Sequence, residues 1–146
     1  MTGKLVLFLA VLLSIGSASE EVLKIGWRDL KEVTFKERFD VSQKNFYKIP
    51  AFGPSVKRLA GKRIVIKGYM IPVSLPDHLY VISENPMSSC FFCGSAGPET
   101  LMEVVFTRKE QRFKTDEIRT LNGVLELNET DQGRMIYLLT AAEVSE

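Results

Sequence analysis

The sequence predicts an all-β protein, a small five-stranded OB-like Greek-key barrel with an N-terminal arm. Three observations lead to this fold class. Five segments rich in β-branched and aromatic residues follow one another after residue 60. The longest of them contains a glycine, which often marks a bulge or a sharp bend in a strand. A long polar connection separates the third segment from the fourth, which fits a Greek-key barrel. A β-sandwich is the alternative.

The first residues have the pattern of a secretory signal peptide. Lys4 gives a positive start, residues 5–13 are continuously apolar, and Gly16–Ala18 supplies the small residues that precede a cleavage site. The apolar run is shorter than the roughly 20 residues that a transmembrane helix needs. We therefore expect residues 1–18 to be removed and the chain to be exported, periplasmic or secreted in a bacterium. No membrane span is expected after cleavage.

The net charge limits the classes of partner. The chain has 19 Lys and Arg against 18 Asp and Glu. The predicted signal peptide contains one lysine and no acid, so the mature chain has a charge near zero. Nucleic-acid-binding domains usually have a basic excess, and we therefore expect no nucleic-acid partner. The sequence leaves the oligomeric state open.

The mature chain is predicted to divide into an arm at 19–58 and a barrel domain at 59–146. Val33–Phe35 favours a short edge strand, and the aromatic residues and prolines of Phe46–Phe52 favour extended chain. We expect the arm to lie across the outside of the barrel, with Trp27 as its anchor. A short helical turn at Pro54–Ala60 should close the arm, because proline suits a first helical turn and a glycine follows.

The barrel strands follow in order. The third has a clear alternation, with Met102, Val104 and Phe106 on one face and the residues between them on the other. The connection between the third and fourth strands is polar, so the helix usual there in OB folds should be short or missing. The predicted strands are Lys62–Val73, His78–Ser83, Thr100–Thr107, Ile118–Leu127 and Met135–Thr140.

The loop before the third strand contains both cysteines. Cys90 and Cys93 have a Cys-x-x-Cys spacing, and the glycines and proline that follow favour an irregular backbone. Three interpretations remain open. The pair could form a disulfide inside the loop or be inert, it could be a redox pair, or it could bind metal. The helix that activates thioredoxin-like thiols is not predicted here. Gly94 stands where a c-type haem motif needs histidine.

A metal site would need further ligands. Closed zinc sites have four, so zinc would have to recruit His78, Glu99 or Glu103, a partner's side chain or water. Copper(I) prefers soft ligands and could recruit Met87, three residues before the first cysteine. Zinc or copper is therefore the cofactor to consider. Glu99 and Glu103 could converge near the loop, although solvated charge at a strand start is the simpler interpretation. His78 matters only if the barrel brings it beside the cysteines.

Four aromatic residues are candidates for a binding surface. Phe91 and Phe92 separate the cysteines. They could form an exposed recognition patch, or one could plug the end of the barrel while the other covers it. Tyr69 and Tyr80 could line a ligand groove, because OB-type sheets often stack aromatic side chains on ligands. The sequence has no phosphate loop and no nucleophile elbow, so no catalytic residues are predicted.

Two stretches together resemble a known family. Gly61–Pro72, followed by Cys90–Glu99, is similar to small exported bacterial proteins of unknown function. Their common core is a Gly-Tyr-Met-Ile-Pro strand, a cysteine-pair loop and an OB-like barrel. The resemblance implies an envelope location, a non-enzymatic role and an envelope partner. Some relatives lie beside ABC-type transporter components, including metal-uptake systems. Only the signature itself carries over: Cys90, Cys93, Gly94, Pro98 and Glu99.

The sequence thus predicts an exported, non-catalytic binding or accessory module of an uncharacterised family. The resemblance points to envelope zinc or copper handling linked to a transporter. Two alternatives stay open. One is a thiol–disulfide redox protein that uses Cys90 and Cys93. The other is a structural interaction domain with an inert disulfide.

Overall fold

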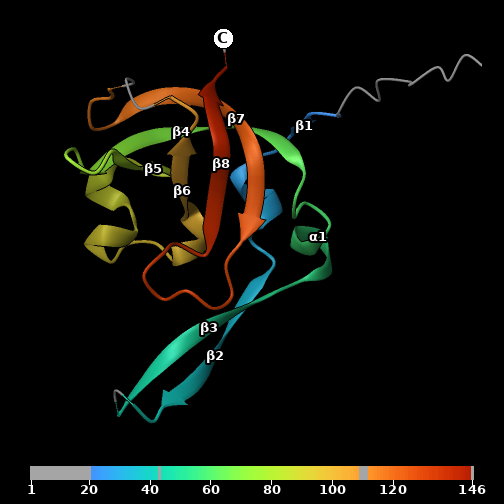
Figure 1. Cartoon of the computed structure of the whole chain (residues 1–146), viewed down its shortest axis with the longest axis vertical. Coiled ribbons are helices and arrows are strands. Elements are labelled where there is room, and N and C mark those ends of the chain that lie inside the picture. Colours follow the sequence, from blue (N-terminus) through green and yellow to red (C-terminus); the bar gives the residue numbers. More distant parts are fainter. Residues whose placement is uncertain (1–20, 43, 109–111, 146) are drawn as a thin grey trace, which may run out of the picture.

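The computed structural model describes residues 21–42, 44–108 and 112–145 (Figure 1). The predicted signal peptide lies outside these residues. Within the described ranges, no helix is long and apolar enough to cross a membrane.

Five strands close into a barrel with the strand order of an OB fold (Figure 1). The order is β4-β5-β6-β8-β7, and pairing between β4 and β7 closes it. β6 and β8 are parallel, whereas the other barrel pairs are antiparallel. The predicted fold class is confirmed. The strands are β4 (Arg63–Ser74), β5 (Leu79–Ser83), β6 (Leu101–Phe106), β7 (Glu117–Leu127) and β8 (Tyr137–Val144).

Alternate side chains along the strands point inward and fill the barrel. Inward-facing residues form one core, to which β6 contributes Met102 and Val104, with Phe106 packed against it. The face predicted for this strand is therefore correct. Leu101, on the other face of β6, is equally buried but belongs to a second, smaller apolar cluster. The barrel is thus covered on part of its outer surface, where the candidate site lies.

Gly68 in β4 is required by a close approach of two backbones. A Cβ at this position would meet the carbonyl oxygen of Ser83 at 2.5 Å and Cγ1 of Ile82 at 2.9 Å. The bulge in this strand pair lies elsewhere, between Pro72 and Ser74. The glycine therefore lets β4 pass the end of β5 tightly.

Trp27 anchors the first part of the arm to the barrel. β1 (Leu23–Lys24) pairs in parallel with β4, and a 3₁₀ turn, η1 (Trp27–Leu30), follows. Trp27 is buried, and its indole Nε1 donates a hydrogen bond to the carbonyl of Lys67 at 2.9 Å. Tyr137 Oη donates to the carbonyl of Leu30 at 2.6 Å. Hydrogen bonds from two large, buried aromatic side chains thus fix this segment.

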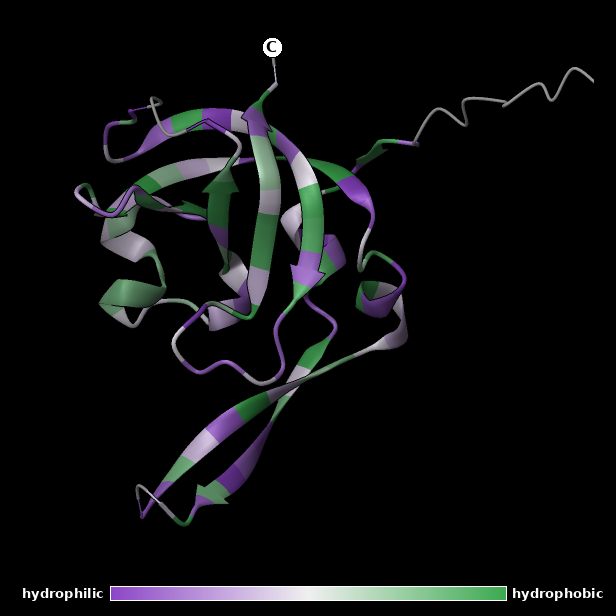
Figure 2. Ribbon diagram, in the orientation of Figure 1, coloured by the Kyte–Doolittle hydropathy of each residue, from purple (hydrophilic) through white to green (hydrophobic). Residues whose placement is uncertain are grey.

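The rest of the arm forms a hairpin that extends away from the barrel (Figure 1). β2 (Val33–Asp40) and β3 (Asn45–Phe52) pair along their whole length as a separate two-stranded sheet. Val33–Phe35 does lie in a strand, but that strand is longer than expected, and this part of the arm pairs with itself and does not lie across the barrel. Hydrophobic and hydrophilic bands alternate along both strands (Figure 2). Phe39 and Phe46 pair near the tip, where they are 48% and 64% exposed.

A helical turn and a coil complete the barrel. α1 (Pro54–Lys57) starts at a proline and leads into β4, as expected. The described part of the connection between β6 and β7 contains no helix. Phe113 from this connection stacks on Phe106 with ring centroids 5.3 Å apart, and its ring also meets Tyr80 edge-on. These aromatic rings close one end of the barrel.

Candidate functional site

The cysteine loop, residues 84–100, packs on the outer face of β4, β5 and β6. It consists of three 3₁₀ turns: η2 (Met87–Ser89), η3 (Phe91–Cys93) and η4 (Pro98–Thr100). Gly94 ends η3 with φ +73°, a conformation that favours glycine. Cys90 is fully buried and belongs to the outer apolar cluster. The other members of that cluster are Ile71, Val81 and Leu101, with Met135 packed against them.

The two thiols converge on one carbonyl oxygen. Cys90 Sγ donates to the Met87 carbonyl at 3.2 Å, and Cys93 Sγ donates to the same oxygen at 2.9 Å. Both cysteines are free thiols in this structure; Cys90 is buried and Cys93 is exposed. Met87 N donates to Asp116 Oδ1 at 2.7 Å, which ties the turn to the start of β7. The loop thus has one buried and one exposed cysteine.

The cysteine loop also exposes large apolar side chains. Phe91 and Phe92 are 38% and 42% exposed, and Met87 is 37% exposed. The phenylalanine rings meet edge-on, with centroids 6.1 Å apart. Neither ring plugs the barrel, so the expectation that one does is wrong. The structure matches the alternative, an exposed patch.

The other predicted ligands do not gather around the thiols. Glu99 folds back over Gly97. His78 lies in the turn before β5, and the cysteine loop follows the other end of that strand. Glu103 is held by an arginine. Among the residues that the structure describes, no group of three or more His, Cys, Asp or Glu could hold a metal ion. A closed zinc site with these residues as ligands is therefore not formed here.

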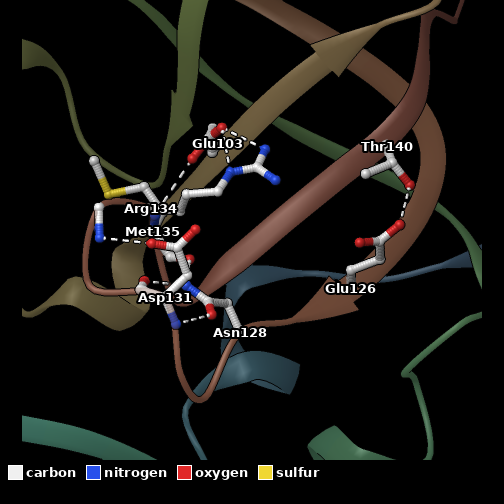
Figure 3. A network of polar contacts seen from close by, with 8 residues as sticks. Glu103, Glu126, Asn128, Asp131, Arg134, Met135 and Thr140 are labelled. Atoms are coloured by element: carbon white, nitrogen blue, oxygen red, sulfur yellow. Dashed lines mark hydrogen bonds and ion pairs between the residues drawn. The ribbon is translucent and has the colours of Figure 1, made fainter.

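Glu103 is the centre of a polar network on the same outer face (Figure 3). It is 8% exposed, and its Oε1 accepts hydrogen bonds from Arg134 Nε at 3.0 Å and Nη2 at 2.6 Å. The carboxylate raises the pKa of the Arg134 guanidinium through these bonds, against the opposing effect of burial. Asn128 shapes the turn that carries Arg134, because its amide nitrogen donates to the carbonyls of Asp131 and Met135.

A groove of about 190 Å³ lies between the start of β5 and the end of β6. Three sequence-predicted residues, His78, Tyr80 and Glu103, line it together with Arg108 and apolar side chains. His78 Nδ1 and Tyr80 Oη are buried, and neither has a hydrogen-bond partner within the described ranges. The structure therefore brings these three residues together at a place separate from the cysteines.

Tyr69 and Tyr80 do not share a groove. Tyr80 is fully buried and packs in the barrel core, where its ring contacts Phe106 edge-on. Tyr69 is partly exposed, and its strand neighbour Met70 is the one that enters that core. Consecutive strand residues point to opposite faces, so the two tyrosines lie on different sides of the sheet.

Two arginines were missed by sequence reasoning. Arg134 neutralises Glu103, and Arg108 lines the groove. A signal existed for the first, since Glu103 stands in the middle of a predicted strand between apolar residues. A carboxylate in that position needs a cationic partner once the outer face is covered. No local pattern indicates which arginine supplies it.

Comparison with known proteins gives one likeness, at the level of the fold. No family model matches the chain. No curated protein matches it either. Among solved structures, it is similar to a DUF3299 family protein from Pseudomonas aeruginosa PAO1, with a TM-score of 0.53 and 11% sequence identity. The similarity covers 86% of this chain and 97% of that one. It shows a common barrel architecture and carries no residue roles.

Proposed function

We propose that this chain is an exported, non-catalytic binding module that docks a protein partner of the bacterial envelope through its cysteine loop. One observation carries the proposal. The loop exposes three large apolar side chains, Met87, Phe91 and Phe92, while Cys90 beside them is fully buried. Exposing two adjacent phenylalanine side chains to water is unfavourable, and exposed apolar patches commonly mark surfaces that a partner covers.

The anchoring of the loop supports a recognition role. Cys90 packs against Ile71, Val81 and Leu101, and Asp116 accepts a hydrogen bond from the backbone of Met87. The exposed rings are therefore held in a fixed position relative to the barrel. A pre-organised surface loses less conformational entropy when a partner binds than a flexible one does. Transporter components are the partners that the family resemblance suggests.

Site-directed photo-crosslinking in the cell tests this proposal. A benzophenone amino acid is placed at Phe91 or, as a matched control, at Ile118, which is 49% exposed on β7. We expect one discrete crosslinked protein from position 91 in the envelope fraction, lost when Phe92 is changed to Ser. No adduct at position 91, or the same adduct at position 118, would contradict the proposal. Fractionation of the same cells tests export.

Metal handling is the more specific form of this function, and the donor set favours copper(I) over zinc. Two cysteine thiols already meet at the Met87 carbonyl, and thiolates with a thioether suit copper(I). Zinc would need four ligands, and the described residues bring no third His, Cys, Asp or Glu to the pair. Native mass spectrometry of anaerobically purified protein tests it. One copper per chain, lost in the Cys93→Ser variant, is the expected result. Retention of copper by that variant would count against it.

Thiol–disulfide exchange is the second candidate, and the position of the sulfurs favours it. Both Sγ atoms lie within hydrogen-bond distance of one oxygen, so the two thiols are close neighbours in the loop. Cys93 is exposed and open to attack, whereas Cys90 is buried. Equilibration with glutathione buffers, followed by alkylation, tests it. A pair that stays oxidised in millimolar reduced glutathione would be structural and not a redox pair.

A further inference from the structure

The tip of the β2–β3 hairpin combines exposed aromatic side chains with unpaired basic ones. We propose that it binds the anionic surface of a phospholipid bilayer, with Phe39 and Phe46 as the inserted pair. The hairpin extends away from the barrel (Figure 1). Each of its strands has eight residues, a length of about 25 Å. The tip can therefore touch a bilayer while the barrel stays in water.

Large apolar side chains are exposed at this end of the hairpin. Phe39 lies opposite Phe46 across the strands, and their ring centroids are 4.9 Å apart. They are 48% and 64% exposed, and Val41, just after β2, is 80% exposed. Val33 and Phe52, at the other end of the same face, pack in or against the barrel core. The apolar face of the hairpin is thus covered at its base and uncovered at its tip.

The charges of the hairpin favour an anionic surface. Residues 33–52 contain four basic side chains and two acidic ones. Glu37 lies opposite Lys48 across the strands, and Asp40 accepts hydrogen bonds from the backbone and the hydroxyl of Ser42 at 2.8 and 2.6 Å. The near-zero charge of the whole chain does not oppose binding, because exposed charges more than about 8 Å apart are largely screened at physiological salt. The tip therefore interacts with a surface through its own basic excess.

Lys36 and Arg38 lie where lipid headgroups would surround them. Both are exposed, and neither makes an ion pair with a described residue. They precede Phe39 in the strand, so they lie about 10 and 3 Å back from the aromatic pair. The headgroup layer is roughly 5–8 Å thick on each side of a bilayer. Rings inserted at the acyl boundary would therefore place both long cationic side chains within reach of the phosphates.

Strand addition by a second copy of the chain is the less favourable use of this hairpin. Symmetric antiparallel pairing along the full β2 edge would place two Lys36 or two Glu37 side chains opposite each other. Charged edges of this kind oppose pairing between sheets. β3 contains Pro50, which has no backbone donor for an added strand. The edges of the hairpin thus disfavour a strand partner, and the aromatic tip is the part that fits a lipid surface.

Co-sedimentation with phospholipid vesicles tests the proposal. The protein is used without residues 1–18, because a retained signal peptide would itself bind lipid. We expect saturable binding to vesicles made of equal parts of phosphatidylglycerol and phosphatidylcholine. Each basic side chain near an anionic surface strengthens binding about fivefold. Binding to pure phosphatidylcholine should therefore be at least about tenfold weaker, and binding to the mixed vesicles should weaken as salt rises.

One pair of double variants tests the aromatic contribution. Phe39→Ser with Phe46→Ser should weaken binding to the mixed vesicles about tenfold or more, because it removes the apolar area that enters the bilayer. Ile118→Ser with Val144→Ser is the matched control. It removes two large apolar side chains of the barrel, 49% and 37% exposed, and should leave binding unchanged.

A second pair tests the charges and leaves the aromatic rings in place. Lys36→Gln with Arg38→Gln should weaken binding to the mixed vesicles about tenfold or more. Lys57→Gln with Arg58→Gln, at exposed positions at the end of α1, should not. The proposal is overturned if the unaltered protein binds no vesicles, which is the result expected if the tip docks on a protein. Equal binding to neutral vesicles, or equal losses for the hairpin and control variants, would overturn it as well.

Discussion

The two cysteines should respond very differently to the same substitution. Cys90 is 0% exposed among Ile71, Val81 and Leu101, so Cys90→Ser places a hydroxyl in an apolar cluster. The hydroxyl can still donate to the Met87 carbonyl, which limits the loss to about 1–3 kcal/mol. Cys93 is exposed, so Cys93→Ser should change stability by less than about 0.5 kcal/mol.

Urea unfolding under reducing conditions measures both effects. The unfolding midpoint should fall for Cys90→Ser and stay in place for Cys93→Ser, with equal m-values for all three proteins. Reductant is required because a disulfide would tie the two positions together. Equal losses for the two variants, or no loss for Cys90→Ser, would refute the claim that Cys90 anchors the loop. A lower m-value for Cys90→Ser would instead show that the folded loop has already opened.

Three further predictions concern buried polar side chains of the barrel. Tyr80→Phe should leave thermal stability unchanged or raise it, because it removes a buried hydroxyl that has no partner among the described residues. A loss of about 1 kcal/mol or more would show that the hydroxyl is paired. Burial, with a smaller contribution from a nearby glutamate, raises the pKa of Tyr137 above its ordinary value of 10.0, so unfolding should become easier as pH rises above 10. Tyr137→Phe should lose about 1–3 kcal/mol near neutral pH, by leaving the Leu30 carbonyl unpaired, but should show a shallower alkaline decline in chemical denaturation. Arg134→Ala should lower the free energy of unfolding by about 1–2 kcal/mol, because it leaves Glu103 unpaired. This loss is smaller than for a fully buried ion pair, because the Arg134 side chain is 38% exposed. Adding Glu103→Gln to the Arg134→Ala variant should restore part of the lost stability.

The barrel could be predicted because each strand has a local signal. β4 combines a long apolar run with Gly68, and β6 alternates so regularly that its residues were divided correctly between two faces. The fold class then followed from the number of strands and the long polar connection. These signals are local, because each depends on only a few neighbouring residues. Local signals predict a barrel well when alternating side chains build its core.

The hairpin was missed because charged residues interrupt the strand pattern of its first half. Val33–Phe35 was seen as a strand, but Glu37 and Arg38 interrupt its apolar pattern and hide the remaining half. β2 keeps its strand conformation there because every residue pairs with β3, which is a contact between segments. The groove was missed for the same reason. His78 and Arg108 lie far apart in sequence, and only the pairing of β5 with β6 brings them to one place.

Glu103 links two parts of the outer β5–β6 face. The cysteine loop covers the part of the outer β5–β6 face around Val81 and Leu101, and the groove lies toward Leu79 and Val105. Glu103, which pairs with Val81 across the strands and also lines the groove, stands between them. Its ion pair fixes the β7–β8 turn, and Met135 from that turn packs against the Cys90 cluster. A partner bound at the loop would therefore act on the same strand pair that carries the Glu103 ion pair.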